Sequence, residues 1–134
     1  MKPLSPSGPA RPVRVLVVDD DPRVRAGLAG LLAATPGVVV SASTGCPVRA
    51  VAARGLADVA LVDVLLPTLA DGVELVRVLS PYVPVVAISL VGTSRAEALA
   101  AGATAYLEKD GAVEDLLAAL QQAATSGVRN SQAL

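Results

Sequence analysis

The feature that most constrains the fold is a short apolar run, Val13 to Val18 (VRVLVV), which ends directly in three aspartates. A run this short and this rich in β-branched residues is typical of a strand buried on both faces, as in a parallel sheet. Four similar runs follow, at residues 38–42, 58–62, 84–88 and 104–107. Stretches with helical spacing separate them. This alternation predicts an α/β fold with five parallel strands and five helices that cover both faces of the sheet.

Several polar residues indicate where the helices begin. Asp21 followed by Pro22 is typical of a helix N-cap and first helical residue. The segments 71–74 and 94–97 resemble capping boxes, and Asp110 is expected to cap the last helix. Right-handed crossovers leave few topologies for such a chain. The size favours a flavodoxin-like three-layer sandwich with strand order 2-1-3-4-5.

The length of 134 residues allows one domain, which we place at residues 13–125. Residues 1–12 are rich in proline and are expected to form a disordered tail, whereas the polar residues 126–134 are expected to be flexible. No apolar run is long enough to span a membrane. The net charge of −1, without a Lys/Arg cluster, argues against direct nucleic-acid binding.

Histidine is absent, which excludes histidine-activated nucleophiles and the usual zinc ligands. The single cysteine, Cys46, allows no disulfide framework, and this fits a cytoplasmic protein.

Polar side chains follow four of the predicted strands at the point where each strand ends. They are Asp19 and Asp20, Asp63, Ser89, and Lys109. Because the carboxyl ends of parallel strands meet at one edge of the sheet, these side chains should converge. Three carboxylates at one place repel one another, and a divalent cation relieves that repulsion. Oxygen ligands favour magnesium or calcium over zinc.

This set of groups suits phosphoryl transfer to a carboxylate. A carboxylate can attack a phosphoryl group, and the transfer needs mainly positioning and positive charge around the phosphoryl oxygens. Asp63 stands alone on its strand, opposite the acidic pair, and is the predicted nucleophile. Asp19 and Asp20 are then the metal-binding carboxylates, while Lys109 and Ser89 would contact the phosphoryl oxygens.

Four segments carry a resemblance to the receiver domains of bacterial response regulators (CheY-like). They are VLVVDDDP, LVDVLLP, VVAIS and GATAYLEKD, and the similarity spans residues 13–124. The last segment is most similar to the NarL/FixJ-type subfamily. The resemblance implies that Asp63 is the phosphoacceptor, and that Asp20 binds Mg²⁺ directly and Asp19 partly through water. It adds the backbone carbonyl of Leu65 as a metal ligand, allows Mn²⁺ to substitute, and makes Ser89 and Tyr106 the switch residues.

The resemblance also implies a function. The chain would be the receiver of a two-component response regulator, phosphorylated by a sensor histidine kinase or a small phosphodonor. Phosphorylation would change its conformation or its dimerisation and thereby control an output, which is expected to be transcription. A homodimer is expected, and DNA would be bound only through a C-terminal domain outside this chain. Apart from self-phosphorylation and self-dephosphorylation, no enzyme activity is expected.

Three departures from the family pattern leave other functions open. One extra residue lies between Pro67 and Asp71, Leu90 replaces a usually small residue, and the stretch from Ser89 to Gly102 is about two residues short. The short stretch predicts a short or displaced fourth helix. An alternative is therefore an atypical receiver that dimerises without phosphorylation, through the Ala-rich faces of its first and last helices.

A less favoured alternative is a haloacid-dehalogenase-like phosphatase, suggested by Asp19-x-Asp21 after a strand. That reading gives Asp63 no role, and Pro22-Arg23 continues the motif poorly. A dinucleotide-binding fold is disfavoured because the turn after the first strand is acidic rather than glycine-rich.

Overall fold

The computed structural model describes residues 11–90 and 94–133, and side chains up to residue 126. Its centre is a five-stranded sheet in the order β2-β1-β3-β4-β5, with every neighbouring pair parallel. The strands are β1 (Val13–Val18), β2 (Val38–Thr44), β3 (Val59–Asp63), β4 (Val85–Ser89) and β5 (Ala105–Glu108). The predicted α/β class and the order 2-1-3-4-5 are confirmed. The expected N-terminal tail lies almost entirely outside the described residues.

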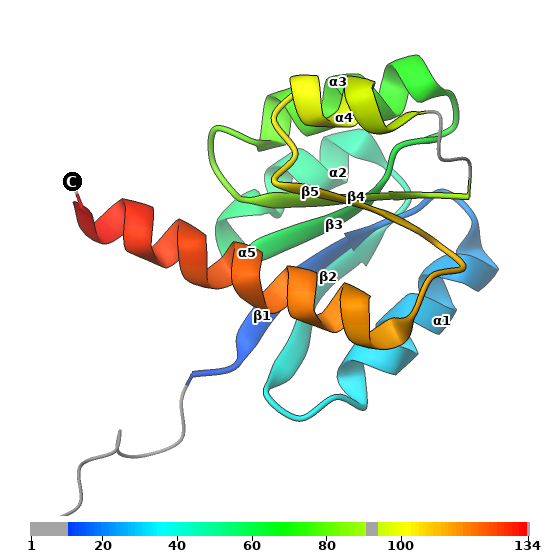
Figure 1. Ribbon diagram of the computed structural model, residues 1–134. Coiled ribbons are helices and arrows are strands. Elements are labelled where there is room, and N and C mark those ends of the chain that lie inside the picture. The colour runs from blue at the N-terminus through cyan, green and yellow to red at the C-terminus, as the bar shows by residue number, and fades with distance from the viewer. Residues whose placement is uncertain (1–10, 91–93, 134) are drawn as a thin grey trace, which may run out of the picture.

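Helices cover both faces of this sheet, as Figure 1 shows. They are α1 (Pro22–Ala33), α2 (Pro47–Ala52), α3 (Leu69–Leu79), α4 (Arg95–Ala100) and α5 (Val113–Ala133), with a short 3₁₀ turn at Arg54–Leu56. Helices α1 and α5 pack on one face, and α2, α3 and α4 pack on the other. The result is the three-layer sandwich that the sequence predicts.

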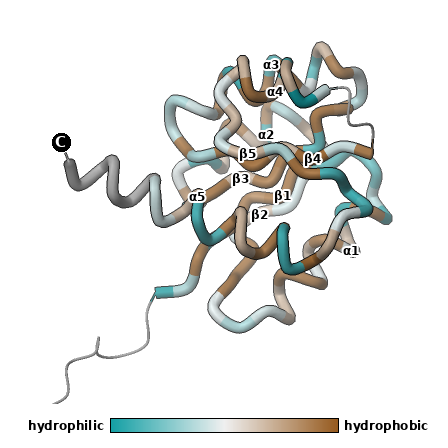
Figure 2. Tube along the Cα trace, viewed as in Figure 1, coloured by the Kyte–Doolittle hydropathy of each residue, from teal (hydrophilic) through white to brown (hydrophobic). Residues whose placement is uncertain are grey.

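The strands are apolar on both faces because each face supplies a separate core. On β1, Leu16 and Val18 belong to the core under α2, α3 and α4, whereas Val15 and Val17 belong to the core under α1 and α5. All four are fully buried, and β1, β3 and β4 run as brown segments through the centre of Figure 2. Burial of one such side chain contributes about 1.5–3 kcal/mol to folding. An aliphatic sequence almost without aromatic residues therefore suffices to form this core.

Helix α3 begins earlier than the sequence analysis predicted. Its N-cap is Thr68, whose hydroxyl oxygen accepts a hydrogen bond from the Asp71 N–H at 3.2 Å. Asp71 therefore lies in the first turn and does not cap the helix.

The predicted capping box at the start of α4 is wrong. Ser94 occupies the N-cap position, but its side chain does not cap the helix. Its hydroxyl lies 2.8 Å from the Tyr106 hydroxyl instead, because Tyr106 on the neighbouring β5 offers a buried polar partner. Helix α4 has six residues and is short, as expected.

The last helix differs from its prediction at both ends. It begins at Val113, so Asp110 lies too far ahead of it to be its N-cap, and it continues to Ala133 rather than ending near residue 125. The polar residues of this stretch are compatible with a helix, and a single glycine in it costs only about 1 kcal/mol. No helix in the described part of the chain is both long enough and apolar enough to cross a membrane.

Candidate functional site

The ends of the parallel strands bring the predicted site residues to one edge of the sheet. Asp19 follows β1, Asp63 and Ser89 are the last residues of β3 and β4, and Lys109 follows β5. Strand register aligns them, since Asp63 pairs with Ile88 and Ser89 pairs with Glu108. Residues more than forty positions apart in sequence thus become neighbours, as the sequence predicted.

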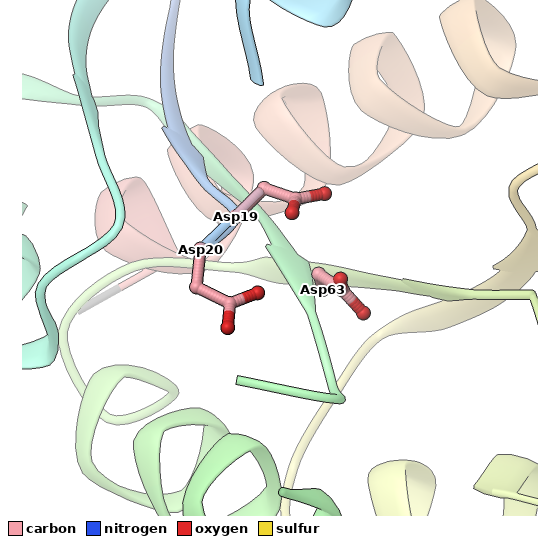
Figure 3. A group of neighbouring side chains, drawn as sticks. All are labelled: Asp19, Asp20 and Asp63. Atoms are coloured by element: carbon pink, nitrogen blue, oxygen red, sulfur yellow. The ribbon is translucent and has the colours of Figure 1, made fainter. Parts of the chain in front are cut away.

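Three carboxylates gather at the centre of this edge. One carboxylate oxygen from each of Asp19, Asp20 and Asp63 lies within 4.8 Å of the other two. Figure 3 shows the three side chains beside the ends of β1 and β3. Asp19 and Asp63 are buried, whereas Asp20 is exposed and accessible from solvent. An oxygen-only donor set of this kind fits a hard divalent cation such as Mg²⁺.

Lys109 bridges two of these carboxylates. Its Nζ donates a hydrogen bond to Asp63 Oδ2 at 2.8 Å and forms an ion pair with Asp19 Oδ2, also at 2.8 Å. Burial alone would lower the pKa of Lys109, but its contacts with Asp19 and Asp63 outweigh burial and raise the pKa. The ammonium group is therefore firmly protonated within the site.

Asp63 is held on both oxygens. Oδ2 accepts the hydrogen bond from Lys109, and Oδ1 accepts one from the Leu65 N–H at 3.0 Å. Burial nevertheless raises the pKa of Asp63, and the nearby charge of Asp19 acts in the same direction. The carboxylate is thus fixed in orientation while its charge remains incompletely compensated, which suits a group that attracts a further cation.

Asp19 is anchored through its backbone and its side chain. Its Oδ1 accepts a hydrogen bond from the Asp21 N–H at 3.0 Å, and its N–H donates to the Thr44 carbonyl at 3.1 Å. Its own carbonyl accepts a hydrogen bond from Arg25 Nη1 at 2.6 Å. Sequence reasoning missed Arg25, because an arginine on an exposed helix usually only interacts with solvent.

The predicted switch residues are buried on the neighbouring strands β4 and β5. Ser89 is fully buried, and its carbonyl accepts a hydrogen bond from the Lys109 N–H at 2.9 Å. Tyr106 is buried too, with its hydroxyl against Ser94. Sequence reasoning also missed Ser94, whose place before a helix suggested capping alone. Leu90 is 66% exposed, so most of its side chain faces solvent.

Comparisons with known proteins agree with this geometry. The family model of the response regulator receiver domain matches residues 15–121. The nitrate/nitrite response regulator NarL of Escherichia coli is 34% identical over 130 residues, which cover 92% of this chain and 60% of that protein. A protein-glutamate methylesterase/protein-glutamine glutaminase of Anaeromyxobacter dehalogenans is 41% identical over 115 residues, which cover 80% of this chain and 32% of that protein. The chain thus spans less than two thirds of either relative.

A solved structure shares the fold. The signal receiver domain of the putative response regulator NarL from Mycobacterium tuberculosis superposes with a TM-score of 0.76 at 28% sequence identity, over 87% of this chain and 98% of that one. The match of the family model covers most of the chain, from β1 into α5. The chain therefore belongs to the family of response regulator receiver domains.

Proposed function

We propose that this domain accepts a phosphoryl group on Asp63 in a magnesium-dependent reaction and then shifts between two conformations to control an output. Phosphorylation and magnesium dependence are general to the family. The observation that carries the proposal for this chain is Lys109, which joins Asp63 to Asp19 beside the three-carboxylate cluster.

The residues divide the chemistry among them. Asp19, Asp20, Asp63 and the Leu65 carbonyl would hold Mg²⁺, for which Mn²⁺ can substitute. When bound, the ion neutralises charge on the phosphoryl oxygens. A carboxylate oxygen of Asp63 attacks phosphorus, and the bond from phosphorus to the donor breaks with its electron pair on the leaving group. Lys109 and the Ser89 hydroxyl would donate hydrogen bonds to the phosphoryl oxygens.

The conformational response would follow from those same contacts. If Lys109 and Ser89 are drawn toward the phosphoryl group, the packing around Tyr106 changes, and the tyrosine moves with it. The Ser94–Tyr106 hydrogen bond of 2.8 Å then becomes part of the resting state. Both states would already exist, and phosphorylation would change their populations.

Mass spectrometry tests the phosphoacceptor. The protein is incubated with acetyl phosphate and Mg²⁺, and the intact mass is measured. Wild-type protein should gain one phosphoryl group, and the Asp63→Asn variant should gain none. Asp110→Asn, which changes an exposed aspartate next to Lys109, is the matched control and should gain as much as wild type. An unmodified wild type, or an equal gain on Asp63→Asn, would contradict the proposal.

The partners and the output are proposals by similarity. The phosphodonor would be a sensor histidine kinase or a small phosphorylated metabolite. The likeness to NarL supports an output in transcription, exerted through a DNA-binding domain outside this chain. Receiver domains are generally regulatory switches and not enzymes. The cytoplasmic location remains a prediction.

The second candidate is a receiver that dimerises independently of phosphorylation. It is favoured by the short α4 and by a cavity of about 360 Å³ that is lined by α1, β5 and the start of α5. The lining combines apolar side chains such as Leu28 and Leu116 with charged ones such as Lys109. Analytical ultracentrifugation distinguishes the two. A dimer that is insensitive to acetyl phosphate and Mg²⁺ favours this candidate, whereas dimerisation only after phosphorylation favours the first.

The phosphatase alternative finds little support. Its motif needs Asp21 as a free acid–base group, but Asp21 Oδ1 accepts hydrogen bonds from the N–H groups of Arg23 and Val24 and so caps α1. Turnover of a generic phosphoester by the wild-type protein would revive this alternative.

A further inference from the structure

Arg25 makes an unusual contact from helix α1 to the acidic edge of the sheet. Its Nη1 donates a hydrogen bond to the backbone carbonyl of Asp19 at 2.6 Å. That carbonyl belongs to the peptide that joins Asp19 to Asp20, the two acidic residues after β1. The arginine side chain is partly buried and brings a positive charge next to a cluster of three carboxylates.

Gly45, in the loop between β2 and α2, leaves the room that Arg25 occupies. A Cβ atom at this position would lie 2.8 Å from Arg25 Nη1, 3.1 Å from the Asp19 carbonyl oxygen and 3.1 Å from Asp20 Cα. Its backbone does not require glycine, because among the described residues only Gly37 and Gly102 have positive φ angles. The reason for glycine at position 45 is therefore space and not backbone conformation.

The two acidic residues depend on this contact to different degrees. Asp19 is also held by the Asp21 N–H and by the Thr44 carbonyl. Asp20 is exposed, so little packing holds its side chain, and the backbone around it sets the direction of its Cα–Cβ bond. Arg25 fixes the Asp19–Asp20 peptide. It also offsets part of the repulsion among the carboxylates before a cation arrives.

We propose that Arg25 is a positioning residue of the metal site, which holds the Asp19–Asp20 peptide so that Asp20 faces Asp63, and that Gly45 is required to admit its guanidinium. The inference rests on the proposed magnesium-dependent function. Outer-sphere partners that orient metal ligands typically contribute 10–100-fold in metal affinity. Because Arg25 holds a backbone carbonyl and not the ligating group itself, we expect an effect near the lower limit, about tenfold.

The test is Mg²⁺ binding by isothermal titration calorimetry on the full chain at fixed ionic strength. Arg25→Met keeps the apolar stem and removes the guanidinium, and its Kd for Mg²⁺ should rise about tenfold. Arg23→Met is the matched control, since it removes an exposed arginine from the same helix, and its Kd should equal that of wild type. Loss of a positive charge by itself should strengthen Mg²⁺ binding. A Kd that falls or stays unchanged in Arg25→Met, or a Kd that changes equally in both variants, would therefore overturn the proposal.

Gly45→Ala tests the contact between Arg25 and the Asp19 carbonyl by crowding the guanidinium instead of removing it. It should also weaken Mg²⁺ binding, whereas Gly55→Ala, where a Cβ meets nothing within 4 Å, should not. In the Arg25→Met background, Gly45→Ala should raise the Kd for Mg²⁺ by a smaller factor than it does in wild type, because the guanidinium that the new Cβ would meet has been removed. Independent, multiplicative effects would contradict the coupling of Arg25 to Gly45.

A metal-free measurement separates positioning from a general loss of stability. Hydrogen exchange of the Asp21 amide, which donates to Asp19 Oδ1, should accelerate in Arg25→Met and Gly45→Ala without Mg²⁺, while amides of β3 and β4 keep their protection. Uniform acceleration throughout the sheet would assign Arg25 a structural role only. If wild-type protein fails to bind Mg²⁺, the proposed function itself fails. If wild type binds and both variants bind equally well, this inference alone is overturned.

Discussion

Ion pairs between carboxylates and basic side chains occur at both the amino and the carboxyl edge of the sheet, but the balance of charges differs between the two edges. At the amino edge, Asp58 accepts hydrogen bonds from the Arg14 N–H at 2.8 Å and from Arg14 Nη2 at 3.0 Å, and Arg11 Nη2 lies 3.5 Å away. At the carboxyl edge, Lys109 lies 2.8 Å from both Asp19 and Asp63. One carboxylate faces two arginines at the first edge, whereas at the second one lysine contacts two carboxylates of a cluster of three.

The pKa values of the two acids differ in direction for this reason. Burial acts to raise the pKa of Asp58, but the hydrogen bonds and charge of Arg14 outweigh it, and the pKa falls. Burial also acts on Asp63, and there the contacts with Lys109 and Leu65 do not compensate for it, so the pKa rises. A carboxylate with surplus cations therefore stabilises the fold, whereas one with too few cations makes a site that attracts a cation.

The largest expected effect comes from the backbone that supports the carboxyl edge. A Cβ atom on Gly72 of α3 would come within 1.8 Å of the Val64 carbonyl oxygen, directly after Asp63. Gly72→Ala should therefore lower the free energy of unfolding by about 3 kcal/mol, measured by urea denaturation. Gly30→Ala in α1, where a Cβ meets nothing within 4 Å, should instead stabilise by about 1 kcal/mol. A neutral Gly72→Ala would show that the α3–β3 contact is loose.

The next largest effect is expected from a substitution that removes the ion pair between Asp58 and Arg14 at the amino edge. Asp58→Asn should cost about 2 kcal/mol at pH 7, because hydrogen bonds to a charged partner are lost. Since the folded-state pKa of Asp58 is lowered, its stabilisation is present above the unfolded value of 3.8 and is lost as the pH falls through the folded value. Urea denaturation from pH 7 to acid should show that the loss of unfolding free energy in Asp58→Asn becomes smaller as the pH falls below 3.8. A cost that is independent of pH would mean that the charge of Asp58 does not matter.

A change of opposite sign is expected at the carboxyl edge. Asp63→Asn removes one of three mutually repelling carboxylates and should stabilise the metal-free protein at pH 7 by on the order of 1 kcal/mol. Because the folded-state pKa of Asp63 is raised, its destabilising effect sets in as the pH rises from the unfolded to the folded pKa. The stabilisation should therefore be full at neutral pH and vanish in acid. Thermal denaturation in EDTA measures this stabilisation. A lower stability of Asp63→Asn would contradict the repulsion among the three carboxylates.

The smallest effect is expected for an ion pair that is exposed to solvent. Arg77 and Glu74 form an ion pair of 2.6 Å on α3, and both side chains are about 60% exposed. Despite the shorter distance, Arg77→Ala should cost only about 0.3 kcal/mol, because solvent screens the exposed pair. Urea denaturation beside Asp58→Asn gives the contrast. Equal costs for the two variants would show that burial does not distinguish these pairs.

The site was largely predictable because each of its main residues ends an apolar run. Asp19, Asp63, Ser89 and Lys109 follow buried strands, and a parallel sheet must collect them at one edge. The start of α3 at Leu69 and the partner of Ser94 were not predictable, because several hydroxyl and carboxylate groups compete for each helix end and tertiary contacts decide between them. Arg25 lacked any signal, since its partner is a backbone carbonyl.

The number of strands, their succession along the chain and the chemical character of their ends follow from the sequence alone, whereas their order in the sheet was taken from known folds of this size. The physical reason is that hydrophobic periodicity and strand length act locally, and crossover handedness leaves few ways to join the elements. Three contacts emerge only once the elements are packed together: Lys109 bridges two carboxylates, Arg25 donates to the Asp19 carbonyl, and Tyr106 pairs with Ser94. These contacts depend on ångström-scale distances between elements, which packing sets and periodicity does not encode.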